Sequence, residues 1–134
     1  MSENAPAVRV FILDDHDQVR EALAARLRAM PDVELVGEAS EVESGLQQVE
    51  ALRPDVVLVE SKRNDGRGLE VVNSLLRQGS GAHVIVLTTY LSEWEEWAVR
   101  RAGVDRYLLK DIDSPKLMDH IRTAARVSQP RSGE

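Results

Sequence analysis

The chain has 134 residues, which is the size of one compact domain and too short for two ordinary ones. Hydrophobic residues make up 43% and charged residues 30%, so the composition excludes collagen-like, low-complexity and wholly disordered proteins. The absence of cysteine excludes disulfide frameworks, thiolate zinc sites, iron–sulfur clusters and a cysteine nucleophile. A formal net charge of −6 argues against direct binding to nucleic acid, because phosphate backbones attract basic surfaces.

The two ends of the chain differ in composition from the rest. The start, MSENAPAV, has no basic segment and no apolar core, and no apolar run in the chain approaches membrane-spanning length. We therefore expect a cytoplasmic protein that makes no contact with a membrane. Small, polar and proline-bearing residues predict a disordered N-terminal tail over 1–7 and a C-terminal tail or cut linker over 128–134. One domain is expected between them, over 8–127.

Short β-branched apolar runs alternate along the chain with longer segments of helical period. Strands are expected at 8–13, 33–39, 56–60, 83–88 and 106–109, and helices at 18–30, 41–52, 69–77, 93–102 and 115–127. Runs such as VVLV and VIVL are apolar at every position, which is typical of parallel strands covered by helices on both faces. The sequence therefore predicts an α/β fold, a doubly wound parallel sheet built from five β-α units.

Local signals support several helix boundaries. Ser40 with Glu43, and Ser92 with Glu95, have the spacing of capping boxes. Gly103 is placed to end the fourth helix as a C-terminal cap. The first helix is expected to pack through one apolar stripe, which consists of Val19, Leu23, Leu27 and Met30.

In sheets of this kind the binding crevice lies beyond the carboxyl ends of the strands. The polar side chains expected there are Asp14, Asp15, His16, Glu60, Thr88, Thr89, Lys110 and Asp111. Three carboxylates in one crevice, from Asp14, Asp15 and Glu60, would repel one another unless a cation or Lys110 offset their charge. Oxygen ligands of this kind suit Mg²⁺. The alternative is that Asp15 or Asp17 caps the first helix.

Five segments, taken in order, resemble the receiver domain of bacterial response regulators: ILDDHDQVREAL, PDVVLVE, GLEVV, VIVLTTY and YLLKDI. The sequence is most similar to the NarL/FixJ-type (LuxR-type output) branch, in which a helix-turn-helix DNA-binding domain normally follows. The resemblance implies a CheY-like, flavodoxin-like (βα)5 sandwich with strand order 2-1-3-4-5. It also implies phosphorelay signal transduction in a two-component system, with a transcriptional output domain outside this chain.

The resemblance further implies a site made of a paired acid, a phosphoacceptor aspartate, a threonine or serine, and a lysine. The corresponding residues here are Asp14 and Asp15, Glu60, Thr88 and Lys110. Asp15, the acceptor carboxylate and the backbone carbonyl of Lys62 would bind Mg²⁺ directly, and Asp14 would help through water. Lys110 would neutralise the phosphoryl group and Thr88 would hydrogen-bond it. We expect no catalytic residue and do not expect the chain to be an enzyme.

Glu60 departs from the family, because the acceptor is normally aspartate. The extra methylene moves the carboxylate by roughly 1.5 Å, in a kind of site where a misplacement of about 1 Å can cost on the order of 10²-fold in rate. The loop SKRNDGR departs as well, since Arg63 and Asn64 stand where a Met-Pro pair is usual. We therefore expect Mg²⁺ binding to be weak or absent. Lys62 and Arg63 could pair with Glu60 or an anion, although solvated charges are the favoured interpretation on a loop expected to be exposed.

Three aromatic residues have two interpretations each. Tyr107 corresponds to the aromatic whose ring position reports activation in the family, which is the favoured interpretation, and the alternative is an ordinary strand aromatic. Trp94 and Trp97 either pack the fourth helix onto the domain, which is the favoured interpretation, or anchor a partner interface. A Glu60 carboxylate that hydrogen-bonded Thr88 or paired with Lys110 would bias Tyr107 toward its active-like position.

The leading hypothesis is a divergent receiver domain, phosphorylation-independent or atypically controlled, that regulates a DNA-binding output absent from this chain. The alternative is an active phosphotransfer receiver with Mg²⁺-dependent phosphorylation at Glu60 or at a nearby acid such as Asp65. A third hypothesis is a metal-dependent hydrolase on the same topology, because a fold does not determine a function. The expected partners are a sensor histidine kinase or other regulatory protein, the output domain, and a second copy in a homodimer.

Overall fold

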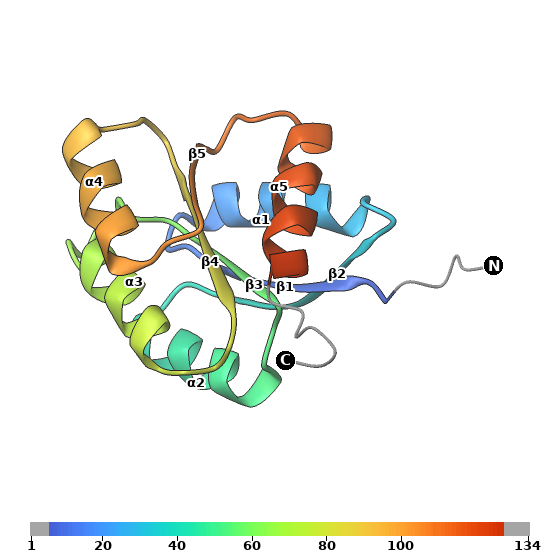
Figure 1. Ribbon diagram of the computed structural model, residues 1–134, viewed down its shortest axis with the longest axis horizontal. Helices are drawn as coiled ribbons and strands as arrows, with labels where there is room; N and C mark the ends of the chain where they lie inside the picture. The colour runs from blue at the N-terminus through green and yellow to red at the C-terminus, as the bar shows by residue number, and fades with distance from the viewer. Residues whose placement is uncertain (1–5, 128–134) are drawn as a thin grey trace.

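The protein is described from a computed structural model, in which residues 6–127 are placed. The elements are β1 (Val8–Leu13), α1 (Asp17–Arg28), β2 (Val33–Ala39), α2 (Val42–Leu52), β3 (Val56–Val59), α3 (Gly68–Arg77), β4 (His83–Thr88), α4 (Glu93–Ala102), β5 (Arg106–Leu109) and α5 (Ser114–Val127). The strands are parallel and lie in the order β2-β1-β3-β4-β5, so the expected fold class and strand order are confirmed (Figure 1). The two expected tails lie outside the described residues, apart from Pro6 and Ala7.

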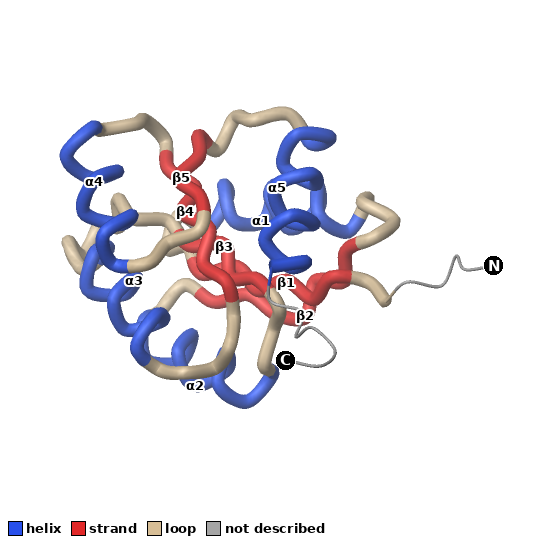
Figure 2. The backbone as a smooth tube through the Cα atoms, in the orientation of Figure 1, coloured by secondary structure: helices blue, strands red, loops and turns tan. Residues whose placement is uncertain are grey.

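The sheet lies between two layers of helices (Figure 2). Helices α1 and α5 cover one face, and α2, α3 and α4 cover the other. Successive side chains of β1 point to opposite faces of the sheet. Val10 and Ile12 pack under the first helix layer, and Phe11 and Leu13 pack under the second. All four side chains are fully buried, which explains why this strand is apolar at successive positions.

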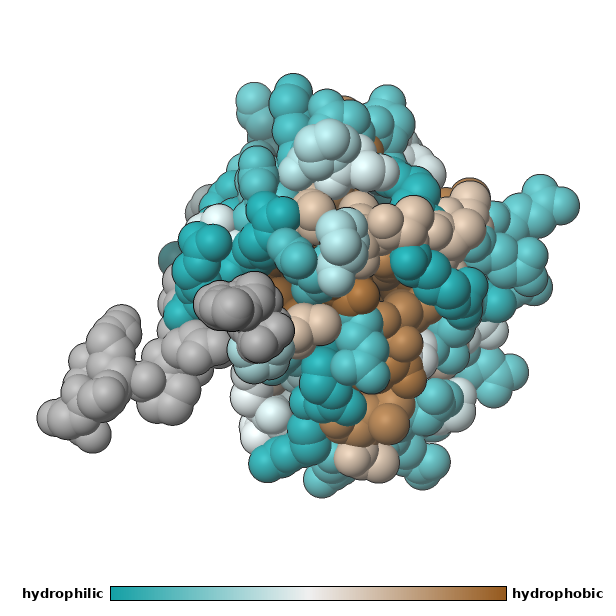
Figure 3. Space-filling model, turned by 90° about the vertical axis from the view of Figure 1, so that its right-hand side faces the viewer, coloured by the Kyte–Doolittle hydropathy of each residue, from teal (hydrophilic) through white to brown (hydrophobic). Residues whose placement is uncertain are grey.

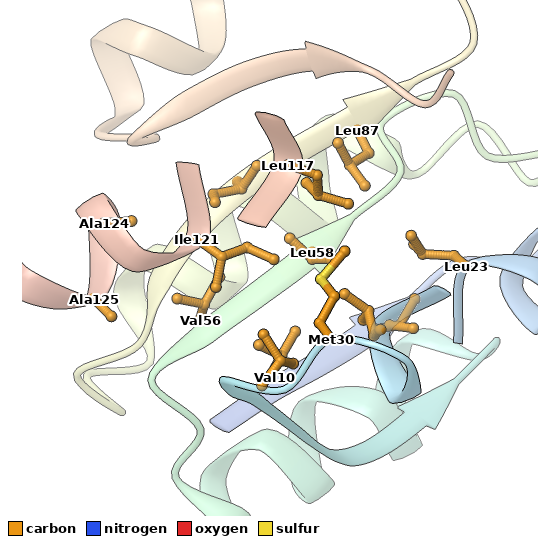
Figure 4. Close-up of a cluster of buried hydrophobic side chains, with 14 of the residues drawn as sticks. Val10, Leu23, Met30, Val56, Leu58, Leu87, Leu117, Ile121, Ala124 and Ala125 are labelled. Carbon is orange, nitrogen blue, oxygen red and sulfur yellow. The ribbon is translucent and has the colours of Figure 1, made fainter. Parts of the chain in front are cut away.

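The core under α5 shows how one helix is held on the sheet. Leu117 and Ile121 are one helical turn apart and lie over Val56 and Leu58 of β3 (Figure 4). Each of these side chains is at most 1% exposed. Full burial of an aliphatic side chain of this size stabilises the folded state by about 1.5–3 kcal/mol. The first helix packs similarly, through Leu23, Leu27 and Met30 of its expected stripe.

Val19 does not share that burial, so the prediction that it packs in the stripe is wrong. Its side chain is 40% exposed, because it borders an open cavity of about 260 Å³ instead of the packed core. The cavity lies between the first turns of α1 and Lys110. The packed part of α1 therefore begins one turn later than the periodicity indicated.

Two of the expected helix ends are confirmed. The Ser92 hydroxyl accepts a hydrogen bond from the backbone N–H of Glu95 at 3.3 Å and caps α4. Gly103 follows α4 with a φ of +113°, a left-handed conformation that glycine adopts without steric cost. The Glu95 side chain does not complete the capping box, because it turns inward to the site described below.

The capping box expected at Ser40 and Glu43 is wrong. Helix α2 begins at Val42 with Glu41 at the cap position, and no side chain caps it. This start places Glu43 at the second helical position instead of the third, so its carboxylate cannot return to the cap. It pairs instead with Arg67, at 3.1 Å.

The right-hand side of Figure 1 carries the edge strand β2. The space-filling view of that side shows hydrophobic surface bordered by hydrophilic side chains (Figure 3). Helix α4 lies at the opposite side of the molecule, over α3 and beside β5 (Figure 1). Among the described helices, none has both the length and the apolar character needed to cross a bilayer.

Gly68 begins α3 in very close contact with the loop that follows β3. A Cβ atom at this position would lie 1.6 Å from the carbonyl oxygen of Ser61. We expect Gly68→Ala to lower the free energy of unfolding by at least about 2 kcal/mol, because the backbone of the loop must move. Chemical denaturation measures the change. Gly79→Ala is the control, since Gly79 has a φ of +74° but open space around it, and we expect a loss of about 1 kcal/mol there. Equal losses in the two variants would contradict this account of Gly68.

Candidate functional site

The carboxyl ends of β1, β3, β4 and β5 form one edge of the sheet. The backbone N–H of Glu60 donates to Leu13 at 3.1 Å, and that of Lys110 donates to Thr88 at 2.8 Å. These bonds extend the strand ladders by one residue, so the side chains that follow the strands face one crevice. Asp14, Glu60, Thr88 and Lys110 therefore gather as the sequence indicated.

Lys110 lies between two buried carboxylates. Its Nζ donates to Asp14 Oδ2 and lies 2.7 Å from Glu60 Oε1 as an ion pair. Asp14 and Glu60 are each 1% exposed. Two carboxylates this deeply buried would strongly destabilise the fold without a cation, so Lys110 supplies the compensation that was expected.

The second oxygen of Glu60 is also occupied. Glu60 Oε2 accepts a hydrogen bond of 2.6 Å from the backbone N–H of Lys62. The Thr88 hydroxyl accepts a hydrogen bond from Lys62 Nζ at 3.1 Å. Of the two contacts expected for Glu60, the one with Lys110 is therefore present, and the structure gives none with Thr88. The Glu60 carboxylate is turned toward Lys110 and its own loop, and the Thr88 hydroxyl is hydrogen-bonded by Lys62 instead.

Glu95, on the inner face of α4, connects this loop to the rest of the site. Its Oε1 accepts hydrogen bonds from Lys62 Nζ at 2.6 Å, Ser61 Oγ at 2.9 Å and the Tyr107 hydroxyl at 2.6 Å. Burial raises the pKa of this carboxyl, but the donors from Lys62, Tyr107 and Ser61 outweigh it and hold the pKa below its usual value. Glu95 is therefore ionised at neutral pH.

Tyr107 is buried at the same place, with 5% of its surface exposed. Burial, and then the hydrogen bond to Glu95, raise the pKa of the phenol well above its usual value. The phenolic oxygen also accepts a hydrogen bond from the backbone N–H of Ser92 at 3.1 Å. The ring thus links β5 to the first turn of α4. Its assignment as a reporter of activation remains a prediction.

Asp15 and His16 complete the acidic corner. Oδ1 of Asp14 accepts from the backbone N–H of His16 at 2.9 Å and lies 3.0 Å from its Nδ1. Oδ2 of Asp15 accepts from the backbone N–H of Asn64 at 2.9 Å. His16 itself is the cap residue of α1 and no side chain caps that helix, so the interpretation of Asp15 or Asp17 as a cap is wrong.

One carboxylate oxygen of Asp15 lacks a hydrogen bond. Oδ1 of Asp15 is buried and accepts none within residues 6–127, although His16 Nδ1 lies 3.5 Å away. Ligand atoms of Asp14, Asp15 and His16 all lie within 4.8 Å of one another. A free buried carboxylate oxygen in this setting fits a cation ligand. Glu60 Oε1 is likewise buried without a hydrogen bond within these residues, and its contact is the ion pair with Lys110 at 2.7 Å. Lys110 thus supplies the positive charge beside Glu60, and a role of Glu60 as a metal ligand remains a prediction.

The loop after β3 is more buried than expected. Arg63 is 8% exposed, and its guanidinium donates to Asp65 at 3.0 Å and to the carbonyl of Ser40 at 2.9 Å. The expectation of a solvated Arg63 on an exposed loop is therefore wrong. The Nε and Nη2 donors are satisfied by the Asp65 carboxylate and the Ser40 carbonyl, which offsets the burial of the charge, whereas Nη1 is buried without a hydrogen-bond partner among the described residues.

Trp94 and Trp97 lie on the outer face of α4, with 64% and 58% of their surfaces exposed. The favoured interpretation, that they pack α4 onto the domain, is wrong. The inner face of α4 carries Glu95 and Val99 instead. A role of the two tryptophans at a partner interface remains a prediction.

Glu95 is the site residue that sequence reasoning missed, because it was considered as a capping residue alone. A signal was present, since Glu95 and Val99 are separated by four residues and therefore share one face of the helix. An acidic residue on the face that carries the buried valine has to find a partner inside the protein.

The response regulator receiver domain model matches residues 10–122, which is most of the chain. The chain belongs to the response regulator receiver domain family. This receiver domain is 37% identical over 119 residues to the transcriptional regulatory protein LiaR of Bacillus subtilis, with 89% of this chain and 56% of that protein covered. It is 36% identical over 115 residues to the DNA-binding transcriptional activator DevR/DosR of Mycobacterium tuberculosis, with 86% and 53% covered.

The receiver fold is equally evident from solved structures. A two-component response regulator of the LuxR family from Aurantimonas sp. SI85-9A1 superposes with a TM-score of 0.82 at 20% identity, with 95% of this chain and 91% of that chain covered. The receiver domain described here spans about half the length of the curated relatives it matches.

Glu95 allows a test of the connection between Lys62, Tyr107 and α4. We expect Glu95→Gln to lower the free energy of unfolding at pH 7 by about 1–3 kcal/mol, because charge-assisted hydrogen bonds are lost inside the protein. A carboxyl whose pKa is lowered on folding stabilises above its unfolded-state pKa and loses that contribution as the pH falls. The difference between variant and wild type should therefore shrink below about pH 4.5, the ordinary value for glutamate.

The control for this prediction is Glu96→Gln, one residue along the same helix. Glu96 pairs with Arg100 at 2.9 Å, but both side chains are about half exposed at 41% and 52%. We expect a change of less than about 0.5 kcal/mol. Urea denaturation over a pH series measures both variants, and a pH-independent difference for Glu95→Gln would contradict the assignment.

Proposed function

We propose that this receiver domain is a signalling module whose state is not set by phosphorylation of Glu60. It regulates a DNA-binding transcriptional output that lies outside this chain. Support for the output comes from the relatives, whose names describe a transcriptional regulatory protein and a DNA-binding transcriptional activator. Support for the atypical control comes from the site itself.

The proposal rests mainly on the contacts that the Glu60 carboxylate makes inside the protein. One oxygen lies 2.7 Å from Lys110 Nζ, the other accepts from the Lys62 N–H at 2.6 Å, and the residue is 1% exposed. A phosphoacceptor oxygen has to approach the phosphorus in line and at close range. A buried carboxylate with one oxygen in an ion pair and the other in a hydrogen bond inside the protein is poorly placed for that attack.

The Lys62 ammonium group gives a second reason. It lies within hydrogen-bond distance of Thr88 Oγ1 and Glu95 Oε1 at once, and so makes the contact with Thr88 that the family resemblance assigns to the phosphoryl group. The Tyr107 hydroxyl donates a hydrogen bond to the same carboxylate, that of Glu95. Thr88 and Tyr107, which correspond to the family's switch residues, are thus held by the side chains of Lys62 and Glu95. A regulator changes such a domain by binding one of its states better than the other.

The alternative, phosphorylation at a nearby acid, receives no comparable support. Asp65 is the acid considered for it, and its carboxylate accepts hydrogen bonds from Arg63 at 3.0 Å and from the backbone N–H of Arg67 at 2.9 Å. Its oxygens are thus held within its own loop, although the side chain is 39% exposed and is not buried as Glu60 is.

The partners proposed for this domain follow from its family. They are a sensor histidine kinase or other regulatory protein, a DNA-binding output domain in the full-length protein, and a second copy of the chain. The domain acts in the cytoplasm as a regulatory protein and not as an enzyme.

Incubation with acetyl phosphate and Mg²⁺, followed by intact-mass measurement, tests the proposal. We expect no stable phosphoryl adduct on Glu60. We expect Glu60→Asp to recover some labelling, because the shorter side chain withdraws from Lys110 and frees an oxygen for attack. Glu60→Gln is the control that removes the carboxylate. A phosphoryl group mapped by peptide sequencing to Glu60 in the wild type would contradict the proposal, and labelling absent from Glu60→Asp would place the defect in the loop 61–67.

Divalent cation binding is a separate expectation. When bound, Mg²⁺ supplies positive charge to the acidic corner, and Asp15 with Asp14 would hold it. We expect calorimetry to show weak Mg²⁺ or Mn²⁺ binding that Asp15→Ala abolishes, since Asp15 carries the free buried oxygen. Asp17→Ala, in which a 72% exposed carboxylate is removed, is the matched control. Identical isotherms for wild type and Asp15→Ala would refute Asp15 as a ligand.

A further inference from the structure

Arg26, in the second half of α1, holds the connection between β5 and α5. Its guanidinium donates to the backbone carbonyl of Lys110 at 3.1 Å, to that of Ile112, and to Ser114 Oγ at 3.1 Å. These three neutral oxygens lie 84 to 88 positions away along the sequence. The planar guanidinium presents its donors in fixed directions, which suits a side chain that binds several oxygens at once. One side chain of α1 therefore holds the whole connection.

The first residue of this connection is Lys110, on which the charge balance of the crevice depends. Its Nζ donates to Asp14 and forms the ion pair with Glu60 at 2.7 Å. Both carboxylates are buried, so they need the ammonium group close by. The lysine stem is long and flexible, and the place of its ammonium group therefore depends on how the backbone and the stem are held.

Packing holds the Lys110 stem incompletely. Lys110 lines the open cavity of about 260 Å³ together with Val19 and Arg26, so no packed core confines it on that side. The backbone of Lys110 is held at both of its polar groups instead. Its N–H donates to the carbonyl of Thr88 at 2.8 Å, and its carbonyl accepts from Arg26 at 3.1 Å. Arg26 is thus the side chain that fixes the carbonyl end of this residue.

The Asp14 end of the ion pair is held by another arginine of α1. Nη1 of Arg20 donates to the backbone carbonyl of Asp14 at 3.0 Å, and Nε of the same side chain pairs with Glu38 of β2 at 3.0 Å. One helix therefore holds the backbone on both sides of the ion pair, through Arg20 at Asp14 and through Arg26 at Lys110. The attraction between two opposite charges weakens as their separation grows, so a side chain that sets this separation controls the pair.

We propose that Arg26 is a positioning residue for Lys110. It holds the carbonyl of Lys110 so that the ammonium group stays between Asp14 and Glu60, and it acts on the crevice through Lys110. The inference goes beyond the proposed function, because Lys110 compensates Asp14 as well as Glu60. Phosphoryl transfer to Glu60 would contradict the proposed function and leave this role of Arg26 standing.

The ammonium groups themselves report the position of Lys110, because the chain contains three lysines, Lys62, Lys110 and Lys116. The side chains of Lys62 and Lys110 are 20% and 10% exposed and each is paired with a carboxylate inside the protein, whereas that of Lys116 is 73% exposed. Burial and hydrogen bonding slow the exchange of hydrogens with water. Heteronuclear NMR of isotope-labelled protein should therefore show slowly exchanging ammonium groups for Lys62 and Lys110.

We expect Arg26→Gln to raise the exchange rate of the Lys110 ammonium hydrogens at least about 5-fold, because the residue is released at its carbonyl end. The Lys62 ammonium group should be unaffected. Arg28→Gln is the matched control on the same helix, since Arg28 is 63% exposed and pairs with Glu38 at 3.4 Å. We expect it to change the exchange rate of neither lysine.

Glu95→Gln is the reciprocal control, because it removes a carboxylate acceptor of Lys62. It should accelerate exchange at Lys62 and leave Lys110 unchanged. A general loss of stability accelerates both lysines, so the selective effect separates positioning from a structural role. An unchanged Lys110 signal in Arg26→Gln, or equal acceleration of Lys62 and Lys110 in that variant, overturns the proposal.

Mg²⁺ affinity gives a second readout, whose sign is opposite to that of a structural defect. Lys110 and a divalent cation offset the same negative charge, so a displaced ammonium group strengthens cation binding. We expect calorimetry to show a dissociation constant for Mg²⁺ that is at least about 3-fold lower in Arg26→Gln, whereas a loosened fold would bind the ion more weakly. In a Lys110→Ala background the same substitution should leave the constant unchanged. An effect of equal size in that background overturns the proposal, because Arg26 would then act without Lys110.

Discussion

The burial of Asp14 and Glu60 beside a single ammonium group, that of Lys110, is the constraint on which the carboxyl edge of the sheet depends. Both carboxylates are 1% exposed, and Lys110 forms an ion pair with each. Loss of one partner of a buried ion pair costs on the order of 3–5 kcal/mol, because a charge is left without compensation. The ends of β1, β3 and β5 are consequently tied together by charge as well as by the ladder.

This constraint also orders the loop after β3. With Lys110 on one oxygen of Glu60 and the Lys62 N–H on the other, the Lys62 side chain extends toward Thr88 and Glu95. Glu95 then holds Tyr107 and the inner face of α4. A continuous chain of polar contacts thus runs from the acidic crevice to the helix that exposes the tryptophans. Such a chain gives a regulator a physical route between the crevice and α4 if the contacts have a second arrangement.

Much of the fold and part of the site could be predicted. The runs of apolar residues marked the five strands, and the acids and Lys110 after them were expected in one crevice because parallel strands end at the same edge. The α2 cap at Ser40 was mispredicted, since a start one residue later removes the capping geometry. The burial of Arg63 was missed as well, because its partner is the Ser40 carbonyl, 23 positions away in the sequence.

The sequence by itself determined the α/β class, the receiver family and the presence of glutamate at the acceptor position, because these depend on local pattern and residue identity. Only the tertiary structure decided which partners the long side chains contact and which of these side chains stay exposed. Glu60 reaches Lys110 and not Thr88, Glu95 turns inward, and Trp94 remains outside. Helical periodicity shows which residues share a face, but which face is covered depends on the neighbouring elements. The ion pairs here join residues dozens of positions apart, and folding alone brings them within hydrogen-bond distance.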